Sequence, residues 1–414
     1  MNTHTKIQIL SLLIRLLPLC MLIACGAGGS AEEFNKIVYR PSDAGGFEIL
    51  GAPGRESVII RSHSPWQGAS SSETRDLLIV RGGEAVPSDF RGQVLSEKAE
   101  RIICMSSGHI AMISLLGDGE KIVGGSSLDF VTSPEIQSRR GDLMEVGHEG
   151  SIDYEALVAA RPDLVILYGV NSANPMEAKL RELKIPYIYI GDYLEESPLG
   201  KAEWLVAIGE CLDKRREAIE QYRPIKENYI SMKARVDSLG SVKRPKVMLN
   251  GPYGDQWMMP PKGSYMVRLI EDAGGEYLYK GGKGNTSQAI SNEEALSLMS
   301  EADRWLNVGS AFKSLEDIRR GVPLMASSEV VGHGEVYNNT YRSTRAGGND
   351  FYESGIVNPD LILRDLIKIM HPDVVSEPFF YYEQLPAVAP AAIAEEDCEH
   401  EYPSEHDEVH DPMP

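Results

Sequence analysis

The stretch that decides the fold is YEALVAARPDLVILY, residues 154–168. Its first part, Tyr154 to Ala160, predicts an amphipathic helix. Its last part, Asp163 to Tyr168, is a short apolar run rich in Leu, Val and Ile, which is typical of a buried strand. A helix that leads directly into such a strand is one unit of an α/β fold.

The same alternation continues on both sides of this stretch. Before it come apolar runs at 102–105 and 121–124, with a predicted helix at 109–116 between them. After it come a predicted helix at 175–183 and an apolar run at 187–190. Because strands and helices take turns, we expect a largely parallel sheet with helices on its faces.

A second region of the same texture follows a long helical stretch. From 201 to 238 apolar residues recur at three- and four-residue steps, and Pro224 is expected to kink the helix or to split it. Beyond Pro245 the pattern predicts strands at 246–249 and 304–308 and helices at 264–273, 292–299 and 358–370. The sequence therefore predicts two α/β lobes, each with a central, mostly parallel sheet flanked by helices, joined by one long helix.

The part of the chain before residue 97 has a different texture. Short β-type runs at 36–39, 47–50, 57–60 and 76–80 alternate with Gly, Ser and Pro, which predicts strands in β-hairpins. We therefore divide the chain into six parts. They are a signal peptide (1–24), a tether and N-terminal β-hairpin region (25–96), an N-terminal lobe (97–212), a connecting helix (213–240), a C-terminal lobe (241–385) and an acidic tail (386–414).

The N-terminus carries a lipoprotein signal. Leu22-Ile23-Ala24-Cys25 ends an apolar run that follows Lys6 and Arg15, and a Gly-rich segment comes next. Cleavage before Cys25 would leave its thiol to carry lipid, so we expect the mature protein to be anchored outside the cytoplasm. The alternative is a plain membrane anchor, for which the apolar run is short.

Composition narrows the range of partners and chemistries. A formal net charge of −20 disfavours nucleic acid, whose phosphates require a basic face. Cys104, Cys211 and Cys398 have neither the spacing of a disulfide framework nor that of a metal site, and Cys104 lies in an apolar run that predicts a buried thiol. The tail from 395 to 414 holds nine acidic residues, three His and no Lys or Arg, and is expected to be disordered rather than a fixed metal site.

Two matching signatures connect the chain to a known family. In the first lobe, Asp153-Tyr154-Glu155-Ala156-Leu157 precedes Arg161-Pro162-Asp163-Leu164-Val165. In the second, Ser291-Asn292-Glu293-Glu294-Ala295-Leu296 precedes Ala302-Asp303-Arg304-Trp305-Leu306, with Ala-Asp where Pro-Asp is more usual. The chain resembles the class III substrate-binding proteins of ABC importers, which capture cobalamin, ferric siderophores or haem. The resemblance covers residues 97 to 375.

The resemblance implies a function and a partner. One glutamate on each lobe would dock on arginines of a dimeric permease, and the matching positions are Glu155 and Glu293. The Ser-x-Glu spacing selects Glu293 over Glu294, although the adjacent glutamate keeps both open. The protein would act as a monomer, deliver a metal complex to the importer, need no cofactor of its own and catalyse no reaction.

The ligand contacts are predicted from the rule that polar groups gather after the carboxyl ends of parallel strands. Ser107 and His109 follow the first strand, Tyr168 follows the strand at 163–167, and Ser310 follows the strand at 304–308. A loop rich in aromatic and Met residues contributes Tyr253 and Trp257, and a polar segment contributes Arg342 and Arg345. Packing inside a lobe or exposure to solvent is the competing interpretation for each of them. Trp66 is expected to pack against the first lobe.

Two other functions stay open at this point. The protein could be an exported lipoprotein that scavenges metal ions or, with less support, an exported hydrolase. No Gly-x-Ser-x-Gly elbow, HExxH motif or phosphate-binding P-loop occurs in the sequence, but catalytic triads are often scattered along a chain. The expected location is the periplasm of a Gram-negative bacterium, with the ligand being an iron chelate, haem or a corrinoid.

Overall fold

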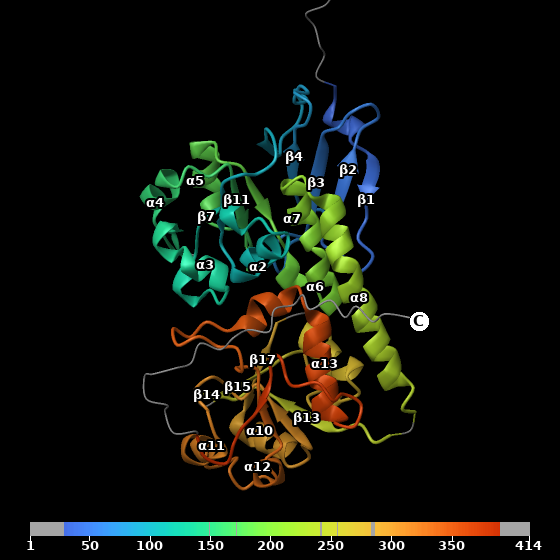
Figure 1. The fold of residues 1–414 in the computed structure, drawn as a ribbon, viewed down its shortest axis with the longest axis vertical. Helices are drawn as coiled ribbons and strands as arrows, with labels where there is room; N and C mark the ends of the chain where they lie inside the picture. The colour runs from blue at the N-terminus through green and yellow to red at the C-terminus, as the bar shows by residue number, and fades with distance from the viewer. Residues whose placement is uncertain are drawn as a thin grey trace, which may run out of the picture.

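The chain folds into two α/β lobes stacked one above the other, with a long helix along one side (Figure 1). The structure is a computed structural model, and it describes residues 29–148, 150–170, 172–240, 242–254, 256–282 and 286–389. The predicted lipidation site Cys25 with its signal peptide, and nearly all of the acidic tail, lie outside the described residues. None of the helices in the described ranges has the length and hydropathy of a membrane span.

The first lobe is built on a five-stranded parallel sheet. Its strand order is β12 (Tyr187–Tyr189), β11 (Leu164–Leu167), β6 (Ile102–Cys104), β7 (Ile122–Gly125) and β8 (Met144–Glu145). The flanking helices are α2 (Ser107–Leu115), α3 (Pro134–Ser138), α4 (Tyr154–Ala159) and α5 (Met176–Leu183). Every residue of β6, β11 and β12 is buried, as expected for a parallel sheet covered on both faces.

The second lobe repeats this plan with one antiparallel edge. Its sheet has the order β16 (Glu276–Tyr277), β13 (Lys246–Leu249), β18 (Arg304–Leu306), β19 (Val336–Asn338) and β20 (Glu383–Gln384), and only β20 is antiparallel. Its helices are α9 (Tyr265–Asp272), α10 (Asn292–Met299), α11 (Leu315–Gly321), α12 (Glu329–Gly332) and α13 (Pro359–Met370). A small antiparallel sheet is made of β14 (Pro252–Tyr253), β15 (Gln256–Met259) and β17 (Gln288–Ser291).

The N-terminal region is one five-stranded sheet, whose first four strands form the predicted β-hairpins. Four antiparallel strands, β1 (Lys36–Tyr39), β2 (Phe47–Gly51), β3 (Val58–His63) and β4 (Thr74–Ile79), are joined by a parallel β5 (Gln93–Leu95) that the sequence did not predict. One face of this sheet shares the core of the first lobe, where Ile49, Ile60 and Leu77 meet Ile102 and Cys104. Cys104 is therefore a buried thiol, as predicted.

The N-terminal sheet also covers the edge of the first-lobe sheet. The Ser62 hydroxyl donates a hydrogen bond of 2.7 Å to the carbonyl of Tyr189 on edge strand β12. Just after β3, the backbone of Trp66 forms an isolated β-bridge with Gly169, and its ring packs beside that of Tyr189. This agrees with its predicted place against the first lobe. Covering the edge leaves fewer backbone groups free to pair with another chain.

The helical stretch after the first lobe is three helices, not one. It divides into α6 (Pro198–Glu203), α7 (Leu205–Cys211) and α8 (Arg215–Asp237). The break before α8 contains Asp213 at φ 61°, a left-handed conformation that ends a helix. By contrast, Pro224 lies inside α8 without dividing it. The helix that runs from the first lobe toward the second is therefore α8, which packs against α13 of the second lobe (Figure 1).

Candidate functional site

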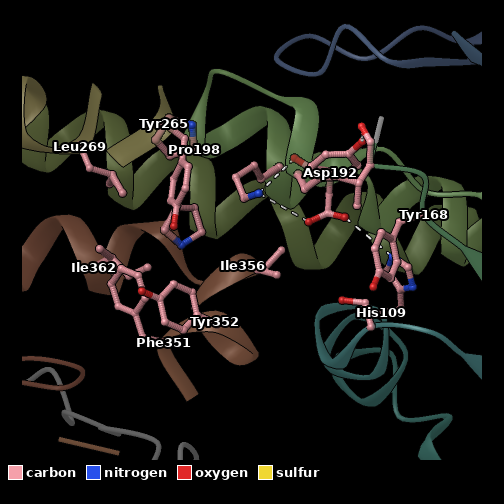
Figure 2. Close-up of a pocket in the computed structure, with 16 residues that line it drawn as sticks. His109, Tyr168, Asp192, Pro198, Tyr265, Leu269, Phe351, Tyr352, Ile356 and Ile362 are labelled. Atoms are coloured by element: carbon pink, nitrogen blue, oxygen red, sulfur yellow. Dashed lines mark hydrogen bonds and ion pairs between the residues drawn. The ribbon is translucent and has the colours of Figure 1, made fainter. Parts of the chain in front are cut away.

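A cavity of about 340 Å³ lies between the two lobes (Figure 2). On the first-lobe side its wall includes residues that lie just beyond the carboxyl ends of strands: Ser106 after β6, Tyr168 after β11 and Asp192 after β12. On the second-lobe side it comes from α9, from the start of α13, and from two 3₁₀ turns, η6 (Asp350–Tyr352) and η7 (Ser354–Ile356). The volume falls at the lower end of the range for small-molecule sites.

One corner of the cavity is polar and is formed by His109, Asp192 and Lys201. The Lys201 ammonium lies 3.6 Å from Oδ2 of Asp192 and donates a hydrogen bond of 3.1 Å to its carbonyl oxygen. On the other side of the carboxylate, Nε2 of His109 is 3.8 Å from Oδ1 of Asp192. Burial alone would raise the pKa of Asp192, but the attraction of Lys201 and then of His109 lowers it overall, so the carboxylate stays charged.

The histidine of this corner is buried and short of partners. His109 is 0% exposed, and neither of its ring nitrogens makes a hydrogen bond with any described residue. Its position follows from the local fold, because α2 begins just after β6 and the Ser106 hydroxyl caps it by accepting from the Gly108 N–H. A buried imidazole without hydrogen bonds is a polar group that a bound ligand could satisfy.

The rest of the cavity is walled by aromatic and aliphatic side chains. Tyr168 and Tyr193 meet edge to face at 6.3 Å on the first-lobe side. On the second-lobe side, Phe351 and Tyr352 form a similar pair at 5.1 Å, and the Lys201 ammonium lies 4.8 Å from the ring centre of Tyr265. These surfaces suit a flat or largely apolar ligand that carries few polar groups.

Two of the predicted ligand contacts lie in this wall. His109 and Tyr168 both line the cavity, because each follows the carboxyl end of a parallel strand. Ser107 is the first residue of α2, and the neighbouring Ser106 takes the place that was predicted for it. The strand-end rule was therefore informative for the first lobe.

The predicted contacts from the second lobe do not reach the cavity. Trp257 is 0% exposed, donates from Nε1 to the Leu249 carbonyl at 2.8 Å, and packs against Trp305 inside the lobe. The prediction of Trp257 as a ligand contact is thus wrong, because the side chain points into the core. Tyr253 is 84% exposed on the β14–β15 hairpin, and Ser310 is exposed after β18.

The two predicted arginines also lie elsewhere. Arg345 is exposed and does not line the cavity. Arg342 faces a second groove between the lobes, of about 740 Å³, where Nε donates a hydrogen bond of 2.5 Å to Asp350 and the guanidinium stacks 4.4 Å from the Phe380 ring centre.

Several cavity residues were not identified from the sequence. Asp192 follows a predicted strand, so the strand-end rule could have found it. Tyr265 lies inside a predicted helix, and Lys201 lies inside a stretch predicted as one long helix. Phe351 and Tyr352 lie in a region without any predicted element. For these four residues the sequence carries no signal, because only the packing of the lobes brings them to the cavity.

The two predicted docking glutamates lie at equivalent places in the two lobes. Glu155 is exposed in the first turn of α4, where Asp153 caps the helix by accepting from two backbone N–H groups. Glu293 is exposed in the first turn of α10, which Ser291 caps by accepting from the Glu294 backbone N–H. Hydrogen bonds to its own backbone N–H and to Ser291 lower the pKa of Glu293, so it is ionised at neutral pH.

Comparison with known proteins identifies the family. The model of the periplasmic binding protein family matches residues 102–338. An uncharacterized lipoprotein of Methanocaldococcus jannaschii is 24% identical over 292 residues, which span 68% of this chain and 67% of that protein. A second, uncharacterized protein of the same organism is 27% identical over 151 residues, which are 45% of its length.

Solved structures share the fold. A periplasmic haem-binding protein from Pseudomonas aeruginosa superposes with a TM-score of 0.54 at 15% identity, covering 71% of this chain and 100% of that one. A periplasmic haem-binding protein from Roseiflexus sp. RS-1 in its apo form superposes with a TM-score of 0.53 at 18% identity, covering 67% of this chain and 99% of that one.

The chain belongs to the periplasmic binding protein family, whose members are binding proteins rather than enzymes. Its family and its lipoprotein relatives indicate a place outside the cytoplasm. These relatives are archaeal, so they give no support to the predicted Gram-negative periplasm.

Proposed function

We propose that the protein is a lipid-anchored binding protein that captures an iron complex, either haem or a ferric siderophore, or a corrinoid. The ligand would sit in the cavity between the lobes and pass from there to an ABC importer. The observation that carries this proposal is the cavity itself, with aromatic walls from both lobes and one buried polar corner.

The chemistry of the cavity supports a flat or largely apolar ligand with a few polar contacts. Stacking on Tyr168, Phe351 and Tyr352 would hold the ligand body, and the unsatisfied ring nitrogens of His109 would meet a polar group or a metal centre. The haem-binding proteins whose folds resemble this one add support for haem among the three ligand classes.

Delivery is the second part of the proposal. Each lobe presents an exposed carboxylate at the start of a helix, Glu155 on α4 and Glu293 on α10. Two carboxylates on two lobes would match a dimeric permease that offers one arginine per subunit, through charge-assisted hydrogen bonds. Lipid on Cys25 would keep the protein close to that permease.

A scavenger of bare metal ions would need a cluster of ligating side chains. Within the described ranges, no group of three or more His, Cys, Asp or Glu side chains converges as a bare metal ion would require.

The first test is to identify what the protein carries. Native mass spectrometry of protein purified from its own host should show a bound iron complex, haem or corrinoid. Titration of the ligand-free protein with haemin, cyanocobalamin and a ferric catecholate should then show saturable binding of one of the three. If all three fail to bind and the native protein carries no such molecule, the proposed ligand class is wrong.

A pair of variants ties binding to the cavity. His109→Ala removes the buried imidazole and should weaken binding of whichever of the three compounds the parent protein binds. The matched control is His333→Ala, which removes an exposed histidine at the end of α12 in the second lobe and should leave binding unchanged. Equal effects of the two variants would contradict the assignment of the cavity.

A further inference from the structure

A second contact between the lobes lies close to the cavity. The Glu353 carboxylate of the second lobe accepts the backbone N–H of Thr132 at 2.7 Å and that of Ser133 at 2.9 Å, just before α3 of the first lobe. Beside it, Asp350 accepts the Thr132 hydroxyl at 3.0 Å. We call these four residues, Thr132, Ser133, Asp350 and Glu353, the interlobe clasp.

The clasp and the cavity share one short segment of chain. Residues 350–356 contribute Asp350 and Glu353 to the clasp, and Phe351, Tyr352 and Ile356 to the cavity wall. This segment also packs tightly on α2, where Ile356 lies against Gly108. A side chain at position 108 would not fit there, because its Cβ would lie 2.4 Å from Cδ1 of Ile356. A shift of the clasp would therefore move the wall that faces His109.

The clasp carboxylate is buried beside another acid. Glu353 is 2% exposed. Burial and then the nearby charge of Asp350 raise the pKa of Glu353 to about 7, although its hydrogen bonds to Thr132 and Ser133 act in the opposite direction. The first lobe presents only Thr132, Ser133 and small or apolar groups to this groove.

The second lobe supplies the other charged groups that face the groove. They are Arg342, which is bound to Asp350, Arg364, and the exposed Glu377. The pH dependence of the clasp thus rests on Glu353 and its neighbour Asp350.

We propose that Glu353 is a positioning residue of the ligand cavity, which holds the 350–356 wall against the first lobe, and that proton uptake by this clasp strengthens ligand binding as the medium becomes more acidic. The proposal rests on the proposed function of the cavity. By linkage, the clasp and the ligand favour the same arrangement of the lobes, so each strengthens the other.

The direction of the pH effect follows from the two states of Glu353. In the clasped state its pKa is about 7, and in an opened, solvated state it would return to its ordinary value of 4.5. Closing therefore takes up a proton between these values, so the clasp is strongest below pH 4.5 and weakens as the pH rises through 7. Between pH 6 and pH 8.5 these pKa values correspond to about a tenfold loss in the closing equilibrium of the clasp, which sets the upper limit for the loss of ligand affinity, because affinity follows the closed fraction of the ligand-free protein.

The test measures haemin affinity against pH by absorption spectroscopy. Binding to the parent protein should weaken from pH 6 to pH 8.5, by at most about tenfold. Glu353→Gln keeps a neutral acceptor and should bind haemin with little pH dependence, whereas Glu353→Ala should bind weakly throughout. The matched control is Glu377→Gln, which removes a carboxylate at the rim of the same groove and should keep the parental profile. A Glu353→Gln profile that equals the parental one would overturn the proposal.

A measurement without ligand separates this proposal from the proposed function. Hydrogen exchange of the Thr132 and Ser133 amides, corrected for intrinsic rates, should be slow in the parent at pH 6 and faster in Glu353→Ala. If haemin does not bind but these amides show this pattern, the ligand assignment fails while the clasp stands. If the two amides exchange equally in both proteins, the clasp is refuted, whatever the ligand.

Discussion

The two walls of the cavity differ in chemistry and in origin. The first-lobe side carries the polar corner of His109 and Asp192, completed by Lys201 from α6, on residues that mostly follow parallel strands. The second-lobe side is formed by helices and 3₁₀ turns, and its lining residues include aromatic and aliphatic side chains but no charged ones. We infer that the first lobe orients the ligand and that the second lobe encloses it.

Asp192→Ala should have the largest effect, because it removes the centre of the polar corner. Lys201, which is 7% exposed, would then lose the carboxylate beside it and remain buried as an uncompensated charge. Breaking a buried pair in this way typically costs about 3–5 kcal/mol of the free energy of unfolding. Denaturant unfolding measures it, with Asp192→Asn as the milder control. If Asp192→Ala lowers the free energy of unfolding no more than a surface substitution does, Asp192 does not stabilise the buried charge of Lys201.

Glu155→Ala combined with Glu293→Ala tests the outer surface, where the two lobes are alike. Removing one partner of a docking pair typically costs about 2–5 kcal/mol. Uptake into cells that carry the importer should therefore be lost, while ligand affinity stays within about twofold, since neither residue lines the cavity. Glu294→Ala should be much milder. Normal uptake by the double variant would mean that these carboxylates do not dock.

Tyr265→Ala probes the enclosing wall of the second lobe. Loss of the apolar contact of one large side chain is worth about 1.5–3 kcal/mol, or roughly 10- to 150-fold in affinity. The matched control is Tyr253→Ala, because Tyr253 is a tyrosine of the same lobe that is 84% exposed and lies outside the cavity. Titration of both variants with the compound that the parent protein binds measures the two losses of affinity. A greater loss in Tyr253→Ala would move the binding surface to the β14–β15 hairpin.

The smallest expected effect is the change in shape on binding. The lobes are linked through the 23-residue helix α8 and are held together by the interlobe clasp. Ligand binding should therefore change the radius of gyration only slightly, well short of a hinged domain closure. Solution scattering with and without haemin measures this change. A large decrease would show that the enclosing wall moves as a body onto the ligand.

The two lobes also differ in how well their cavity residues could be predicted. In the first lobe, His109 and Tyr168 were found because the carboxyl ends of neighbouring parallel strands converge at one edge of a sheet. In the second lobe, the same rule selected Ser310, which is exposed. There the side chains that line the cavity come from α9, α13 and the 350–356 segment, which no strand-end rule identifies.

The sequence by itself determined the alternation of strands and helices, the division into two α/β lobes and the family, because these depend on apolar periodicity and on short local motifs. Only the tertiary structure decided where individual side chains point. Trp257 is buried because β15 pairs with β17, so that Trp257 lies opposite Ile290 and its neighbours Gln256 and Met258 face outward. A shift of one residue in that pairing would have reversed the two faces. In the same way, Glu353 meets Thr132 across 221 residues of sequence. Contacts of that range depend on how the lobes pack, which no local pattern records.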